Sequence, residues 1–158
     1  MIREGGAPWP SADGRVYYGA MELDRVIAEL YDAVCFEPGG EPSWGKLASI
    51  FAPGARIVSV TDEGVTEFDL ASYRKYLEGM IASGAMPSFW EGELWREARV
   101  FGEVANVLSA YDARRTRGGE VLHRGVISIQ LFQRDGQWWI SSMLWRREGS
   151  TVRITDRP

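Results

Sequence analysis

Residues 124–142 read RGVISIQLFQRDGQWWISS, the pattern of two strands joined by a tight turn. The Asp135–Gly136 pair lies between two apolar runs, and type I′ hairpin turns favour such a pair because both central residues need positive φ. Further strand-like segments surround this hairpin, so that strands are predicted over 89–100, 104–116, 121–133 and 137–147. The second half of the chain is therefore predicted to form a long antiparallel meander.

The first half of the chain has the periodicity of helices. Apolar residues recur at the i, i+3, i+4, i+7 spacing from Met21 to Val34, which predicts an amphipathic helix. Two further helices are expected at 43–51, with Ser43 as the cap, and from Asp69 to about Gly84, with Asp69 as the cap. Short strands are expected between these helices at 55–60 and 65–68. Three helices followed by a meander indicate an α+β fold.

The length of 158 residues favours one domain, because domains mostly run about 100 to 200 residues. Residues 1–19 contain Gly, Pro and Ser without a period, so we expect a flexible N-terminal arm. The domain itself is expected over 20–150, followed by a C-terminal tail at 151–158. The first residues lack the apolar run of a secretory signal, and no stretch reaches the length of a membrane span. We therefore expect a cytoplasmic protein.

Charge and composition argue against several classes of partner. With 18 basic and 22 acidic residues the formal net charge is -4, which disfavours nucleic acid and anionic membranes. A single Cys and a single His exclude an internal disulfide and the usual zinc ligand sets. The sequence has no phosphate-binding glycine loop and no nucleophile elbow. We expect no cofactor and no metal, and neither nucleic acid nor a membrane as a partner.

Two stretches resemble the nuclear transport factor 2-like superfamily. Residues 44–58, WGKLASIFAPGARIV, resemble the second helix of that superfamily entering its first strand, and 124–142 resemble its last hairpin. The resemblance implies a cystatin-like cone, in which three N-terminal helices pack on a strongly curved antiparallel sheet. SnoaL-like polyketide cyclases, ketosteroid isomerases and scytalone dehydratase belong to this superfamily. The same fold also serves binding modules and scaffolds, so it does not by itself indicate one function.

His123 and two glutamates are the candidates for proton transfer. His123 is the only histidine, and histidine exchanges protons near neutral pH. In the dehydratase and cyclase branches of the superfamily, a histidine on the sheet works with a carboxylate, and the resemblance implies that role for His123. Glu91 and Glu93 share one face of their strand, and a carboxylate in an apolar cone would have a raised pKa. The alternative is an exposed strand face for the glutamates and a structural histidine.

The seven tryptophans of the chain need a large core, a pocket or an interface. A bent sheet around helices leaves a conical cavity, which is the usual place for a ligand. The residues predicted to line it are Tyr31, Trp44, Tyr73, Trp90, Tyr111 and Ser142. For Tyr31 and Tyr73 the alternative is a place in the core.

The last strand predicts a second buried surface. Alternation along 137–147 puts Trp139, Met143 and Trp145 on one face, opposite a face that contains Trp138 and Ser142. Both faces are apolar, whereas a sheet with one face in water should alternate apolar and polar residues. We therefore expect Trp139, Met143 and Trp145 to form a homodimer interface on the outer face of the sheet, as the resemblance also implies.

Three functions are compatible with the sequence. The leading hypothesis is that a small, largely apolar molecule binds in an aromatic-lined cavity. The first alternative is a cofactor-independent lyase or isomerase, dehydratase- or cyclase-like, in which His123 works with Glu91 or Glu93. The second is a non-catalytic dimeric interaction module whose cone is filled by its own side chains. Catalysis requires His123 and a carboxylate in one cavity, whereas binding requires only the cavity.

Overall fold

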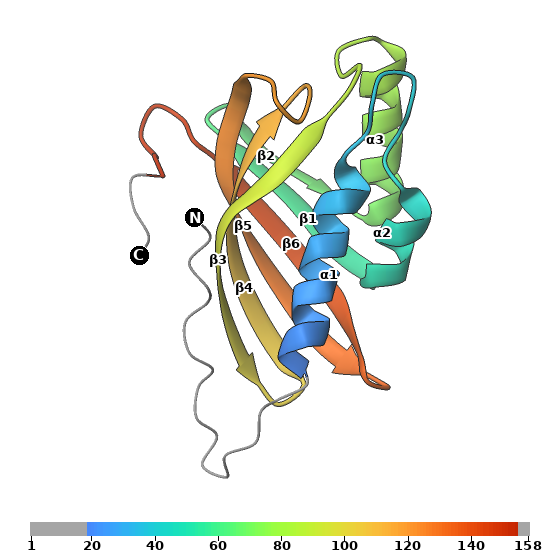
Figure 1. The fold of residues 1–158 in the computed structure, drawn as a ribbon, viewed down its shortest axis with the longest axis vertical. Helices are drawn as coiled ribbons and strands as arrows, with labels where there is room; N and C mark the ends of the chain where they lie inside the picture. Colours follow the sequence, from blue (N-terminus) through green and yellow to red (C-terminus); the bar gives the residue numbers. More distant parts are fainter. Residues whose placement is uncertain (1–18, 155–158) are drawn as a thin grey trace.

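A computed structural model describes residues 19–154, which form three helices and a six-stranded sheet (Figure 1). The helices are α1 (Gly19–Val34), α2 (Trp44–Ile50) and α3 (Leu70–Ala82). The strands are β1 (Phe51–Thr61), β2 (Gly64–Phe68), β3 (Trp90–Phe101), β4 (Val104–Arg114), β5 (Val121–Arg134) and β6 (Gln137–Arg147). Of the predicted arm at 1–19, only Gly19 is described, as the first residue of α1, and the rest lies outside the described residues.

The strands follow the order β2-β1-β6-β5-β4-β3. The meander from β3 to β6 is antiparallel throughout, as predicted, and β1 pairs with β2 in the same way. Only the pair of β1 and β6 is parallel, among the strands described. Parallel neighbours need a long connection, and here the chain passes through α3 and the other strands before β6 returns beside β1.

Local signals of the sequence explain most element ends. Asp135 and Gly136 both have positive φ, 53° and 78°, as a type I′ turn requires. Asp69 caps α3 and forms a reciprocal capping box with Ser72, whose backbone N–H donates to the Asp69 carboxylate at 2.7 Å. Ser43 is the N-cap residue of α2, as predicted, but its side chain makes no capping hydrogen bond. Helix α2 also ends at Ile50, because Phe51 is already extended.

The core lies between α1 and the concave side of the sheet, which α1 crosses (Figure 1). The predicted apolar stripe of α1 is buried, namely Leu23, Val26, Ile27, Leu30, Tyr31 and Val34, and Ala33 is buried beside it. Trp138 on β6 is the largest fully buried side chain, with 1% of its surface exposed. The core therefore fills the part of the cone that α1 covers.

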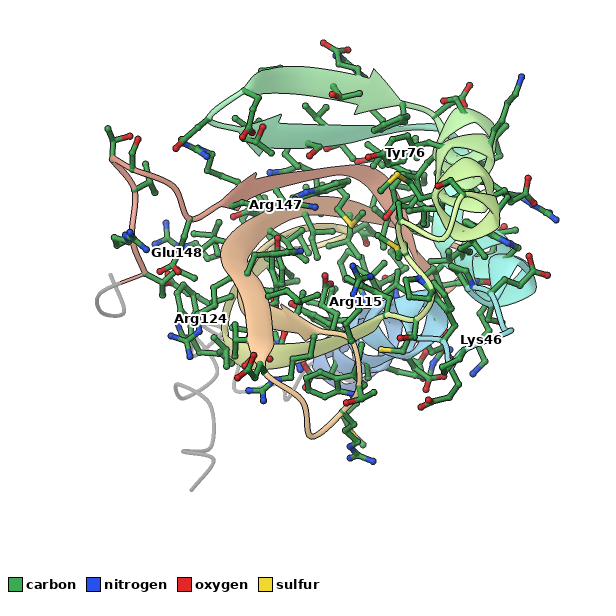
Figure 2. The ribbon with its side chains drawn as sticks, turned by 90° about the horizontal axis from the view of Figure 1, so that it is seen from above. Lys46, Tyr76, Arg115, Arg124, Arg147 and Glu148 are labelled. Carbon is green, nitrogen blue, oxygen red and sulfur yellow. The ribbon has the colours of Figure 1, made fainter. Side chains whose placement is uncertain are left out.

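Interruptions in strand pairing bend the sheet, which curls around its enclosed side chains when seen from above (Figure 2). One interruption lies in β6, where Ile140 pairs with Leu131 but Ser142 pairs with Gln130, so that Ser141 is an extra residue. The extra residue reverses the alternation of faces beyond it.

The bulge at Ser141 corrects the predicted interface. Trp138 and Ile140 point into the core before the bulge, and Met143 and Trp145 point inward after it. The prediction that Trp139, Met143 and Trp145 share the outer face is therefore wrong, because a bulge is not visible in simple alternation. The homodimer itself stays a prediction.

The C-terminal residues cover part of the outer face of the sheet. Val152 and Ile154 border a groove there, together with Trp95 and Leu108 from the sheet. The backbone N–H of Ile154 donates to the carboxylate of Glu148 at 2.7 Å, which holds this segment in place. Within the described residues, no helix has both the length and the apolar character needed to cross a membrane.

Candidate functional site

A cavity of about 200 Å³ lies between α3, the C-terminal half of α1 and the concave face of the sheet. Most of its wall is apolar or aromatic, including Leu30, Phe68, Met80, Phe89, Met143 and Trp145. A cavity of about 150 Å³ can hold benzene. This one therefore has room for an aromatic ring with a small substituent.

Glu91 and His123 reach this cavity from one row of the sheet. Glu91 on β3 pairs with Ala113 on β4, and Ala113 pairs with His123 on β5. Strands lie about 4.8 Å apart, so the backbones of Glu91 and His123 are separated by about 10 Å. Only the methyl group of Ala113 stands between them, and both larger side chains line the cavity. The start of β3 is tied to the end of α1 by two backbone hydrogen bonds between Phe36 and Phe89, at 2.8 and 2.9 Å.

The adjacent row brings Tyr111 and Arg147 to the same wall. Tyr111 on β4 pairs with Gly125 on β5, and Gly125 pairs with Arg147 on β6. A Cβ atom on Gly125 would lie 2.7 Å from the Tyr111 hydroxyl and 2.6 Å from the Arg146 carbonyl oxygen, so only glycine fits there. The Tyr111 ring also meets His123 edge to face, with centroids 5.9 Å apart. The four polar side chains therefore form one connected wall.

The cavity shifts its two proton-transfer candidates in opposite directions. Burial raises the pKa of Glu91 to about 8, although the positive charge of Arg147 opposes the rise. Burial lowers the pKa of His123 to about 4, and the charge of Arg147 lowers it further. Burial also raises the pKa of Tyr111 and of Tyr73. At neutral pH Glu91 is therefore mostly a protonated acid, while His123 is an uncharged base.

Two nitrogen atoms of this wall are buried without a hydrogen-bond partner among the described residues. They are Nε of Arg147 and Nδ1 of His123. Buried polar groups are normally satisfied, so unpaired ones at a cavity mark places for a ligand or water. No group of three or more His, Cys, Asp or Glu side chains suited to a metal ion is found between residues 19 and 154.

Of the two predicted glutamates, only Glu91 shares the cavity with His123. Glu93 accepts a hydrogen bond from the Ser109 hydroxyl and pairs with Arg96 at 3.0 Å. Ser109 in turn is 2.7 Å from the hydroxyl of Tyr31. Glu93, Ser109 and Tyr31 thus form a polar network between the sheet and α1. This network lies outside the cavity, and neither Glu93 nor Tyr31 lines it. Contrary to the prediction, Glu93 therefore does not line the cavity that His123 lines.

Three other residues predicted to line the cavity also lie elsewhere. Trp44, at the start of α2, donates from Nε1 to Glu41 at 3.1 Å. Trp90 precedes Glu91 on β3 and therefore points to the opposite side, where its ring packs on Gly92. Ser142 follows the bulge in β6 and alternates with the inward-facing residue after it. Contrary to the prediction, Trp44, Trp90 and Ser142 therefore do not line the cavity, whereas Tyr73 and Tyr111 do.

The sequence also misses residues of the wall. Arg147 is the only arginine among the residues that line the cavity. In the sequence it follows Arg146, and two adjacent arginines near the end of a strand are typical of a solvent-exposed surface. Met143 and Trp145 belong to the wall as well, although alternation assigns them to the outer face. The one signal of the bulge in the sequence is that both faces of β6 are apolar under simple alternation.

Comparison with known proteins establishes the fold. No family model and no curated protein matches the sequence. A Nostoc punctiforme protein of unknown function with a cystatin-like fold is 10% identical, with a TM-score of 0.63 over 89% of this chain and 95% of its own. An NTF2-like protein of unknown function from Silicibacter pomeroyi is 16% identical, with a TM-score of 0.59 over 82% and 95%.

An enzyme is also similar in structure. The hexachlorocyclohexane dehydrochlorinase LinA-type3 from Novosphingobium barchaimii is 14% identical, with a TM-score of 0.62 over 87% of this chain and 94% of its own. At such identities the likeness concerns the fold alone. The predicted cystatin-like, nuclear transport factor 2-like fold is thus confirmed.

Proposed function

We propose that this chain, with its nuclear transport factor 2-like fold, binds a small, largely apolar molecule in the cavity of about 200 Å³. The observation that supports the proposal most is the combination of an apolar, aromatic wall with four polar side chains on one side. Ligand pockets commonly have this composition, because apolar surface supplies affinity and a few polar groups orient the ligand. A scaffold whose cone is filled by its own side chains would leave no such space.

Methionine methyl groups provide a direct test with phenylacetamide, a neutral probe of suitable size. Met80, Met86 and Met143 line the cavity, whereas Met21 lies on the exposed side of α1. The protein is labelled with carbon-13 at the methionine methyls and titrated with phenylacetamide. The NMR signals of Met80, Met86 and Met143 should shift in a saturable way, and the signal of Met21 should not move. If no cavity signal moves up to millimolar probe, the binding proposal is refuted.

A pair of variants on β2 controls for binding elsewhere. Thr66 lines the cavity, and its neighbour Val65 is 63% exposed and does not line it. Thr66→Trp should obstruct the cavity and weaken probe binding, while Val65→Trp should leave it unchanged. Equal effects of the two variants would place the probe outside the cavity.

A second function, proton transfer in a lyase or isomerase, is favoured by the pKa values of Glu91 and His123. Environments that separate the pKa values of two groups assign one as acid and the other as base. On a ligand with an acidic C–H next to a carbonyl, the His123 imidazole would accept the carbon-bound proton. Glu91 would donate its proton to the carbonyl oxygen, which leaves an enol, an imidazolium and a carboxylate. The dehydrochlorinase among the structural neighbours is an enzyme on the same fold.

Deuterium exchange tests the second function without a known substrate. In D₂O, the benzylic protons of phenylacetone should exchange faster with the wild-type protein than with Glu91→Gln or His123→Gln. General acid–base groups typically accelerate a reaction by about a hundredfold or more. Each variant should therefore lose at least about 99% of the exchange rate that the wild type adds to the rate in buffer. Equal exchange rates with all three proteins would argue against catalysis and leave ligand binding as the function.

The homodimer through the outer face of the sheet is also a proposal. Trp139 is half-buried and Leu144 is 40% exposed on this side of β6. An apolar residue at such a position supports a partner there, since isolated sheet faces in water favour polar side chains.

A further inference from the structure

We infer that the ligand of the cavity is an anion, namely a small apolar molecule with one carboxylate group that the guanidinium of Arg147 receives. The inference rests on the proposed binding function and specifies the class of ligand. It is carried by the position of Arg147, its unpaired buried nitrogen and the charges that surround it.

Arg147 and Tyr111 are placed to meet the same group. They flank Gly125 in one row across three strands, and no side chain separates them. Both line the cavity, and Nε of Arg147 is buried without a partner among the described residues. The guanidinium is a planar fork of donors that matches the two oxygens of a carboxylate. The Tyr111 hydroxyl adds another donor beside it.

The charge of Arg147 lacks direct compensation in the described part of the chain. No carboxylate there lies within ion-pair distance of it, and the nearby Asp112 pairs with Arg114 at 2.7 Å instead. Glu91 shares the cavity, but burial raises its pKa to about 8, so at neutral pH it is mostly uncharged. Arg147 hydrogen-bonds to the Tyr111 hydroxyl, which carries no charge. A partly buried cation without a counter-ion is unfavourable. An anionic ligand would supply the missing charge.

A second arginine lies over the enclosed space. In the view from above, Arg115 lies inside the outline of the curved sheet, whereas Arg124 and Glu148 lie outside it (Figure 2). Arg115 donates to the carbonyl oxygens of Ala85 and Ser88, at 3.0 and 3.4 Å, and neither contact neutralises its charge. Ala85 and Ser88 adjoin Met86 and Phe89, which line the cavity. Positive charge beside a cleft attracts anions from solution.

The wall suits a carboxylate better than a phosphate. A phosphate group carries up to two charges and has three strong acceptor oxygens, which require several donors. Here Arg147 and Tyr111 are the donors in one row, and most of the remaining wall is apolar. One carboxylate on an aromatic or aliphatic body satisfies both parts of the cavity.

Phenylacetate and phenylacetamide test the inference because they have the same shape and differ in charge. Phenylacetate should bind at least about tenfold more tightly, since a charge-assisted hydrogen bond contributes that much. Arg147→Met should remove this preference, weakening phenylacetate about tenfold and phenylacetamide less than twofold. Arg147→Lys, which keeps the charge but loses the fork, should retain part of the preference. Arg124→Met removes an arginine outside the sheet and should change neither affinity.

The outcomes separate this inference from the binding proposal. If both probes bind the wild type equally, the anion inference is wrong while the binding proposal stands. If the preference for phenylacetate survives in both Arg147 variants, Arg147 is not the receptor and the inference is again wrong. If neither probe moves the methionine signals, the binding proposal fails and the inference fails with it. Circular dichroism melting of each variant shows that its fold is intact before these affinities are compared.

Discussion

Replacement of Glu91 by glutamine should change how the stability of the protein depends on pH. Burial in the cavity raises the pKa of Glu91 from 4.5 to about 8 in the folded protein. The folded state therefore binds this proton more tightly than the unfolded state does. The stabilising contribution of Glu91 is complete below pH 4.5 and is lost as the pH rises through 8. A glutamine side chain cannot titrate, so the Glu91→Gln variant lacks this loss.

The pH window follows from the second titrating group of the cavity. Burial lowers the pKa of His123 from 6.5 to about 4, so its contribution is complete above pH 6.5 and is lost as the pH falls through 4. Between pH 6.5 and 8, the contribution of Glu91 to stability therefore changes with pH, whereas that of His123 stays nearly constant. While the folded protein holds a proton that the unfolded chain has released, the free energy of unfolding falls by about 1.4 kcal/mol per pH unit. Over this window the wild type should therefore lose about 2 kcal/mol relative to Glu91→Gln.

Urea unfolding of both proteins at pH 6.5 and at pH 8 measures the effect. The difference in unfolding free energy, variant minus wild type, should grow by about 1 to 2 kcal/mol between the two pH values. His123→Gln is the matched control, because its difference from the wild type should vary with pH below 6.5 and stay constant above it. A Glu91→Gln difference that is the same at pH 6.5 and 8 would refute the reasoning about the buried carboxyl group.

Gly125→Ala should destabilise the fold by about 1 to 3 kcal/mol in urea unfolding, because its Cβ would lie 2.7 Å from the Tyr111 hydroxyl; an unchanged midpoint would show that the close approach is absent. Ser109→Ala should cost about 1 to 3 kcal/mol, since the buried hydroxyl of Tyr31 and the carboxylate of Glu93 both lose a partner; a cost below about 0.5 kcal/mol, the low end for one hydrogen bond, would contradict the network. Sedimentation equilibrium at micromolar concentration should give twice the mass of the chain, and a monomer would rule out the homodimer.

Elements that depend on neighbours in the chain could be predicted from the sequence. The stripe of α1 follows from apolar spacing, the Asp69 cap from its position before an apolar helix, and the Asp135–Gly136 turn from its need for positive φ. These signals act over a few residues, and together with the quoted stretches they were enough to indicate the fold. His123 and Glu91 could be chosen as candidates because their chemistry is visible in the sequence. Their common row, through Ala113, depends on strand pairing.

By itself the sequence determined the helices, the hairpins and the proton-transfer candidates. Only the tertiary structure decided which side chains meet, since the bulge at Ser141 exists only in the pairing of β6 with β5. That single extra residue turns Met143 and Trp145 into the cavity, and it brings Arg147 there while Arg146 pairs with Asp62 at 2.6 Å outside the cavity. Two adjacent arginines look equivalent in the sequence. The register of the sheet gives one of them a structural ion pair and leaves the other facing the cavity.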